Sequence, residues 1–439
     1  MRTIIRDVLT VTMNGNREID FLTIVIEGEL IRKLARSGVV EKKGDRVLKG
    51  DNMIALPGLI NGHVHGDIAL ARGLGDGYTL YEQDYDSPVS RKKWFRDELN
   101  REARHYSRLL QYVESVKGGT TFICDVPFWW YGDDIAAPFY ETGIAGGVVL
   151  DYRKDFLTGE EVPPEEYAET AGNLREKGII PIVEAPAEED FDEGLLLGLH
   201  RRAVDLDTLI QLHLAETTWR LGIIRERYDC TPVQYLDRIG FLDGRVIGSH
   251  GVWLTPEDRN LLKNRGARIV NCPIAEMKIA DGVAPVQPLI GDSVPVGLGS
   301  DGALWNDASD MFSEMKTLLL LQRLGYGASS MSCWDTLYAA TRGGAEVFGM
   351  GGELGSIEEG KRASLVLIDC LKPHLAPLYT KNPSNVIQLL TCCARGSDVD
   401  TVIVNGRIVV EGGRMTTIDE RSLLTDCSRI ARERFEGKF

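Results

Sequence analysis

The sequence lacks long apolar runs and an excess of basic residues. No stretch approaches the roughly 20 apolar residues that span a bilayer, and the opening MRTIIRDVLTVTMNGNREID is interrupted by charge. The 50 Lys and Arg residues are outnumbered by 65 Asp and Glu residues, which gives a formal net charge of −15. Nucleic acids and anionic membranes attract basic surfaces. We therefore expect neither a nucleic acid nor a membrane as a partner.

Cysteine motifs are also missing, and histidine is scarce. The eight cysteines are scattered, and none has the spacing of a zinc knuckle or a thioredoxin pair. The chain has 439 residues, and its start does not read as a signal peptide. We expect reduced thiols and a cytoplasmic location. Because there are only seven histidines, their positions are informative.

Both ends of the chain have strand-like patterns. Near the start, TIIRDVLTVT and FLTIVIEGELIRKLA are rich in β-branched residues. Near the other end, VDTVIVNGRIVVEGGRM contains Asn-Gly between apolar strands, which is a hairpin signal. We predict one small β-sandwich domain formed by both termini. Its parts are residues 1–55 and residues 356–439, and the second part ends in a tail helix.

The middle of the chain repeats one pattern. Apolar runs rich in β-formers alternate with segments of helical spacing. Eight such runs lie at 53–61, 120–126, 145–151, 178–185, 208–214, 245–250, 267–272 and 294–301. Apolar strands alternating with helices indicate a parallel sheet covered on both faces. Eight units is the count of a (β/α)₈ TIM-like barrel, so we predict an α/β fold with this barrel over residues 56–355.

Four of the seven histidines fall where these runs end, and an aspartate ends the eighth. His63 and His65 are two residues apart in GLINGHVHGD and so share one strand face. Active sites of such barrels lie at the C-terminal strand ends. Three imidazoles and a carboxylate, from His63, His65, His213 and Asp301, form a ligand set that suits Zn²⁺, with Fe²⁺ and Mn²⁺ as alternatives. Such a cation lowers the pKa of bound water to about 7.

Two further residues lie near this predicted metal site. Glu216 follows His213 by three residues in LHLAET, where it can shuttle a proton from the water to a leaving group. Its alternative role is that of an acid at a helix N-terminus. His250 ends the sixth run, in VIGSHGVWL. It either completes the metal site or polarises the substrate, and we favour the second role. The third interpretation is a buried histidine that is only hydrogen-bonded to the backbone.

Four motifs together carry a family resemblance. PGLINGHVH, LHLAET, GSHGVWLT and GLGSDGALWNDASDM resemble the metal-dependent amidohydrolase superfamily. They are most similar to its aminohydrolase branch, which includes S-adenosylhomocysteine and methylthioadenosine deaminases and the triazine and atrazine chlorohydrolases. The similarity covers nearly the whole chain. A catalytically silent scaffold would be expected to have lost a ligand, so we expect an enzyme.

The resemblance implies a mechanism and a substrate class. One divalent metal is held by the four predicted ligands, Glu216 relays a proton, Asp301 takes a proton from the nucleophilic water, and His250 lies beside the attacked carbon. The implied reaction is metal-hydroxide attack on an aminated heterocycle of purine, nucleoside, pterin, pyrimidine or triazine type, with release of ammonia. The alternative is displacement of chloride or an alkylamine, or hydrolysis of a cyclic amide. The resemblance also implies a homo-oligomer.

The sequence departs from this family in its substrate-facing segments. Nucleoside deaminases carry His-Asn-Pro-x-Ser-Asn-Met-Lys where this chain has NCPIAEMK at 271–278. Glu276 in this run either faces a basic substrate group or starts a helix. Trp129 and Tyr81 are candidate substrate contacts, since aromatic rings stack on flat ligands; for Trp129, packing in a lid or a subunit contact is the alternative. We expect a changed substrate within the same hydrolytic class.

Overall fold

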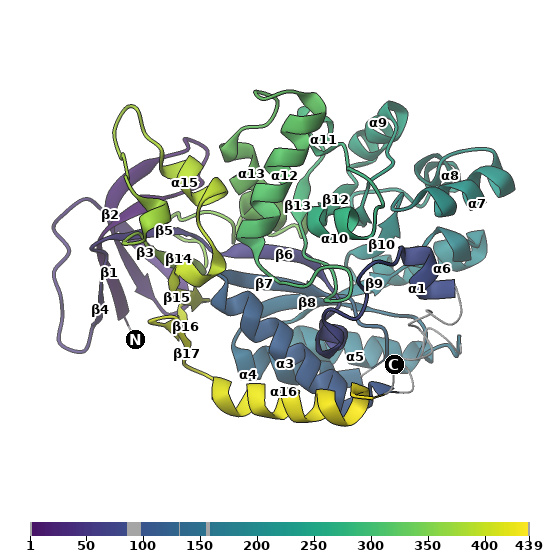
Figure 1. The fold of residues 1–439 in the computed structure, drawn as a ribbon, viewed down its shortest axis with the longest axis horizontal. Helices are drawn as coiled ribbons and strands as arrows, with labels where there is room; N and C mark the ends of the chain where they lie inside the picture. Colours follow the sequence, from purple (N-terminus) through teal and green to yellow (C-terminus); the bar gives the residue numbers. More distant parts are fainter. Residues whose placement is uncertain (1, 86–97, 131, 155–158, 438–439) are drawn as a thin grey trace.

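The computed structural model describes residues 2–85, 98–130, 132–154 and 159–437. Eight parallel strands follow one another in sequence order and curl into a nearly closed barrel (Figure 1). Beyond the last strand, the backbone N–H groups of Ser300 and Asp301 donate to the His63 carbonyl of the first strand at 3.2 and 2.9 Å. The predicted (β/α)₈ fold is confirmed.

The barrel strands are short and their C-terminal ends carry the polar residues singled out above. These strands are β6 (Leu59–Val64), β7 (Thr120–Asp125), β8 (Ala145–Leu150), β9 (Ile180–Glu184), β10 (Ile210–Leu214), β11 (Val246–His250), β12 (Arg268–Asn271) and β13 (Val296–Leu298). The helices of this region are α1 (Leu80–Tyr85), α3 (Arg101–Lys117), α4 (Ala137–Thr142), α5 (Pro164–Glu176), α6 (Glu193–Asp205), α7 (Thr218–Tyr228), α8 (Pro232–Arg238), α9 (Pro256–Arg265), α10 (Pro273–Lys278), α11 (Val286–Gly291), α12 (Met311–Tyr326), α13 (Cys333–Ala340) and α14 (Arg342–Val347).

Several helices begin where the sequence supplies a cap. The side chain of Asn100 accepts from the Ala103 N–H at the start of α3, and Thr217 does the same for the Arg220 N–H at the start of α7. At α9, Thr255 forms a capping box and Pro256 takes the first helical position. These side chains satisfy backbone donors that a helix leaves unpaired. The cap at Thr217 matters for the site, because it starts α7 directly after Glu216.

A second sheet gathers the two ends of the chain (Figure 1). Its core is shared, because buried side chains such as Ile24, Ala55, Leu365 and Ile403 belong to one cluster. Its nine strands are β1 (Arg2–Val11), β2 (Ile19–Glu27), β3 (Leu30–Ala35), β4 (Arg46–Lys49), β5 (Met53–Pro57), β14 (Leu365–Asp369), β15 (Val399–Val404), β16 (Arg407–Glu411) and β17 (Arg414–Met415). The predicted terminal β domain is thus confirmed in its composition, while its limits at 55/56 and 355/356 stay predictions.

Two helices follow β14. α15 (Val386–Cys392) precedes β15, and α16 (Glu420–Phe435) is the predicted tail helix. In Figure 1, α16 runs along the barrel beside α3 and not along the terminal sheet. Ion pairs of Lys117 with Glu420 and of Arg429 with Glu102 join α3 to α16. None of the helices within the described residues is both long and apolar enough to cross a membrane.

The first apolar run differs from its prediction. Residues 53–61 were expected as one barrel strand, yet they divide into β5 of the terminal sheet and the start of β6 of the barrel. The chain changes sheets at Pro57 and Gly58. The Gly58 N–H donates to the Ser364 carbonyl at 3.0 Å, and a Cβ at this position would collide with the Thr121 side chain. Two adjoining buried strands produce one continuous apolar pattern, so periodicity alone could not separate them.

Candidate metal centre and active site

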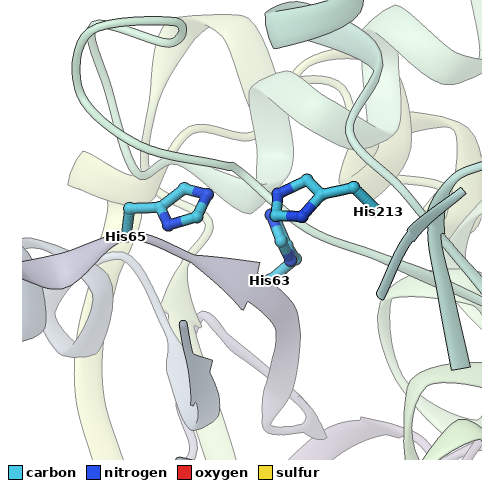
Figure 2. Close-up of side chains that lie close together, drawn as sticks. All are labelled: His63, His65 and His213. Carbon is cyan, nitrogen blue, oxygen red and sulfur yellow. The ribbon is translucent and has the colours of Figure 1, made fainter. Parts of the chain in front are cut away.

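Three histidines converge at the C-terminal end of the barrel. His63 belongs to β6, His65 is the first residue after that strand, and His213 belongs to the fifth barrel strand, β10. Figure 2 shows their rings facing a common space, and one nitrogen from each lies within 4.8 Å of the other two. The alternation of side chains along β6 explains the pair: residues i and i+2 project from the same face.

Hydrogen bonds fix the orientation of the His65 and His63 rings. His65 Nδ1 lies 2.7 Å from the carbonyl oxygen of Val126, which can only accept, so Nδ1 carries the proton and Nε2 is left bare. His63 Nδ1 lies 3.1 Å from the Ser249 hydroxyl. Within the described chain, the buried His63 Nε2 has no hydrogen-bond partner. Such an orphaned nitrogen fits a metal ligand.

Burial keeps these two imidazoles neutral, which is the form that binds metals. It lowers the pKa of His65 to about 4, and it lowers the pKa of His63 well below the ordinary value, with further lowering from the neighbouring histidines. Asp301 supplies the negative charge of the set. Its Oδ1 lies 3.3 Å from His65 Nε2 and 3.6 Å from His63 Nε2. The structure therefore brings all four predicted ligands together.

Asp301 is held in place by its backbone. Its φ of 62° is left-handed, and its N–H bonds to the His63 carbonyl. Burial raises the pKa of its carboxyl to about 7. A buried carboxylate needs a compensating positive charge, and a divalent cation would be the largest local charge in such a site.

Glu216 and His250 lie beside the histidine cluster. Glu216 Oε1 is 3.6 Å from His250 Nε2, and the rings of His213 and His250 stack at 5.4 Å between centroids. Burial alone would lower the pKa of His250, but the carboxylates of Glu216, Glu276 and Asp301 raise it to about 10. Both ring nitrogens of His250 face carboxylates, Nε2 that of Glu216 and Nδ1 that of Glu276, an arrangement that favours the substrate contact over the ligand role.

Glu276 lies behind His250. Its Oε1 is 3.5 Å from His250 Nδ1, and its carboxylate accepts from Asn271 Nδ2 at 2.7 Å and from the Cys272 N–H at 2.9 Å. It is buried and is not among the described residues that line the cavity. The structure thus places Glu276 behind His250, in the first turn of α10, and not on the described cavity lining. A direct substrate contact of Glu276 stays a prediction.

A cavity opens next to the cluster, and the two aromatic candidates differ in their relation to it. Trp129 lines the cavity and is buried. Tyr81 is half-exposed, packs against Trp219, and is not among the described lining residues. The structure thus does not bring Tyr81 to the cavity, because its position on α1 directs it outward. Phe128, whose ring stacks on His65 at 4.5 Å, and Trp305 complete an aromatic wall that suits a flat ring.

Sequence reasoning missed the arginine that pairs with Glu216. Arg220 forms ion pairs with Glu216 and Glu189, the latter through a 2.9 Å hydrogen bond. All three line the cavity. The spacing of Glu216 and Arg220, four residues apart where the loop enters α7, was the available signal, since residues at this spacing come close when a helix begins between them.

Comparisons with known proteins give matches along most of the chain. Residues 54–409 match the amidohydrolase family. A 5′-deoxyadenosine deaminase of Methanobrevibacter smithii is 32% identical and aligns over 93% of this chain and 94% of its own length. A 5-methylthioadenosine/S-adenosylhomocysteine deaminase of Pyrococcus furiosus is also 32% identical, over 91% of this chain and 93% of its own.

Solved structures share the fold. An adenosine deaminase from Xanthomonas campestris with bound zinc superimposes with a TM-score of 0.89 at 24% identity, covering 98% of both chains. An atrazine chlorohydrolase from Arthrobacter aurescens complexed with zinc gives 0.88 at 20% identity, covering 98% of this chain and 100% of the other. At these identities the likeness concerns the fold alone.

Proposed function

The chain belongs to the amidohydrolase family, and we propose that it is a metal-dependent aminohydrolase that removes an amino group from a nitrogen heterocycle. Water adds its oxygen to the ring carbon that bears the amino group. The C–N bond then breaks, and the nitrogen leaves as ammonia. The products are ammonia and the hydroxylated, or oxo, heterocycle.

We propose His63, His65, His213 and Asp301 as the ligands of one zinc ion. The chemistry of these residues supports the set. The imidazoles of His63 and His65 are buried and neutral, and the Asp301 carboxylate lies 3.3 Å from His65; three imidazoles with a carboxylate suit zinc. When bound, such an ion supplies Lewis acidity and makes a nucleophilic water available near neutral pH.

The remaining roles fall to the chain's own side chains. Glu216 accepts a proton from the attacking water and returns it to the leaving nitrogen. Asp301 is the second carboxylate within reach of that water. His250, charged between Glu216 and Glu276, donates a hydrogen bond to the oxygen that adds to the ring. The aromatic wall of Phe128 and Trp305 holds the ring flat. The observation that carries the proposal is the convergence of the three histidine nitrogens within 4.8 Å beside this cavity.

The test is ammonia release by zinc-loaded protein. The panel holds adenosine-type nucleosides, free purines, pterins, cytosine-like pyrimidines and amino-triazines. We expect release from one class, and a loss on the order of 10²- to 10⁴-fold in Glu216→Gln with zinc content unchanged. The control is Glu226→Gln, an exposed acid on α7, the helix that follows Glu216, which should behave as wild type. Silence of the zinc-loaded wild type across the panel would refute deamination and favour displacement of another leaving group or cyclic-amide hydrolysis.

A further inference from the structure

Glu216 follows a residue whose backbone is strained. Ala215 has a φ of 50°, in the left-handed region that residues with a side chain rarely adopt. Its N–H donates to the carboxylate of Glu188, which is 0% exposed and lies in the short helical turn η3 (Glu188–Asp190) after β9. The Trp253 N–H donates to the Ala215 carbonyl at 2.9 Å. The backbone that carries Glu216 is therefore held by the segments that follow β9 and β11.

Arg220 connects the same turn to the side chain of Glu216. It lies in the first turn of α7, where Thr217 accepts from its N–H, and it is buried. Its Nη1 forms an ion pair with Glu216 Oε2. On its other side, Nη2 donates to Glu189 Oε1 at 2.9 Å, and Nε lies 2.7 Å from Glu189 Oε2. The turn η3 thus holds Glu216 twice, through its backbone and through Arg220.

The two carboxylate oxygens of Glu216 have different surroundings. Oε2 faces the guanidinium of Arg220, whereas Oε1 lies 3.6 Å from His250 Nε2. Because an arginine stays protonated in proteins, Oε2 is held as an acceptor, in a charge-assisted bond that is roughly twice as strong as a neutral one. The oxygen left to exchange a proton is Oε1, on the side of His250.

Arg220 lines the cavity, so binding an anionic group of the substrate is its alternative role. Its single positive charge already faces two carboxylates, those of Glu216 and Glu189. An added anion would place three negative charges around one guanidinium, and like charges repel strongly where burial lowers the dielectric constant. The charges around Arg220 therefore favour a role toward Glu216.

We propose that Arg220 is a positioning residue: it fixes the Glu216 carboxylate so that Oε1 takes the proton from water and returns it to the leaving nitrogen, and Glu189 fixes Arg220. This inference rests on the proposed deaminase function and adds to it a residue that none of the four sequence motifs contains. Because Arg220 acts through Glu216, its removal matters only where Glu216 can relay a proton.

The test is a double-mutant cycle on the best substrate of the ammonia panel. Four zinc-loaded proteins are compared: wild type, Arg220→Met, Glu216→Gln, and the variant with both substitutions. In Arg220→Met we expect kcat to fall roughly 10- to 100-fold, because a small misplacement of a catalytic group has effects of this size, while KM changes less than about threefold.

In the Glu216→Gln background, the same replacement of Arg220 should change kcat by less than about threefold, since the effects of residues that act as a unit do not add. The control is Arg225→Met, which removes an exposed arginine of α7 and should behave as wild type.

Three results would overturn the inference. An unchanged kcat in Arg220→Met would show that Glu216 keeps its position without the guanidinium. A raised KM at wild-type kcat would show that Arg220 binds the substrate. An equal fall of kcat in both backgrounds would show that Arg220 does not act through Glu216. In each case wild type still releases ammonia, so only this inference fails; silence of wild type across the panel would instead remove the proposed function and this inference with it.

Zinc content and melting temperature of each variant report on folding. Arg220→Met leaves the carboxylates of Glu216 and Glu189 without their shared cation, which destabilises the fold. If this variant does not fold, Arg220→Met combined with Glu189→Gln takes its place, because it removes one of the two stranded charges. The expected fall of kcat and its absence in the Glu216→Gln background stay the same.

Discussion

Replacement of Arg108 by methionine should destabilise the fold and the metal centre together. Arg108 lies on α3 with 1% of its surface exposed. Its Nε donates to Asp125 Oδ2 at 2.9 Å, and its Nη2 lies 3.4 Å from Asp67 Oδ2. Both aspartates are 0% exposed. Arg108→Met leaves two buried carboxylates without their shared cation, a change that costs about 3–5 kcal/mol.

The same aspartates hold the two backbone segments that contact His65, the one that follows it and the one that contains Val126 and Phe128. Asp125 Oδ1 accepts from the Gly66 N–H at 2.9 Å, and Asp67 Oδ2 accepts from the Phe128 N–H at 3.0 Å. Because Val126 accepts from His65 Nδ1, a shift of these segments misdirects Nε2. Loss of such outer contacts lowers metal affinity by about 10- to 100-fold, and we expect a loss of that size here.

Two assays measure these effects: urea denaturation of the metal-free protein, and zinc competition against a chelator of known affinity. The control is Arg101→Met, on the same helix with 79% of its side chain exposed, where loss of a surface ion pair costs about 0–1 kcal/mol. Adding Asp125→Asn to Arg108→Met removes one stranded charge and should recover part of the stability. Equal stability of Arg108→Met and Arg101→Met would show that the buried network is not what holds this region.

Three further predictions concern the site. His213→Ala should lose both zinc and ammonia release, measured by metal analysis and activity; full zinc occupancy would remove His213 from the ligand set. Gly299→Ala adds a Cβ 2.8 Å from His63 Cβ and 2.9 Å from Cys272 Sγ, so we expect the free energy of unfolding to fall by about 1–3 kcal/mol and zinc to bind more weakly. The control is Gly291→Ala, whose Cβ meets nothing within 4 Å and which should not change zinc binding. Equal zinc affinity in both variants would contradict this prediction. Glu184→Gln should gain stability relative to wild type as the pH rises from about 5 to about 8. Folding raises the pKa of the Glu184 carboxyl, so the wild type loses stability as the pH rises toward that raised pKa, and the variant does not. A melting-temperature difference between the two proteins that stays constant with pH would refute the raised pKa.

The barrel and the clustering of the four predicted ligands were readable from the sequence because these residues lie at the strand ends. Each predicted run from Thr120 onward contains one barrel strand, and His63, His65, His213 and Asp301 meet at one end. These predictions depend only on strand periodicity and on the geometry of parallel sheets.

What the sequence could not provide were contacts between distant residues and changes of sheet. The boundary at Gly58 was hidden inside one apolar run. The orientation of Glu276 depends on Asn271 and Cys272 holding its carboxylate, and the outward position of Tyr81 depends on where α1 packs. Homo-oligomer formation and a cytoplasmic location stay predictions.

The most direct test of a metal-dependent hydrolytic centre is a zinc titration of chelator-treated, metal-free protein, with ammonia release measured after each addition on the best substrate of the panel. We predict no release from the metal-free protein, a linear rise up to about one zinc per chain, as expected for a single four-ligand site, and a plateau beyond it. Full ammonia release by protein shown to hold no metal would contradict the account.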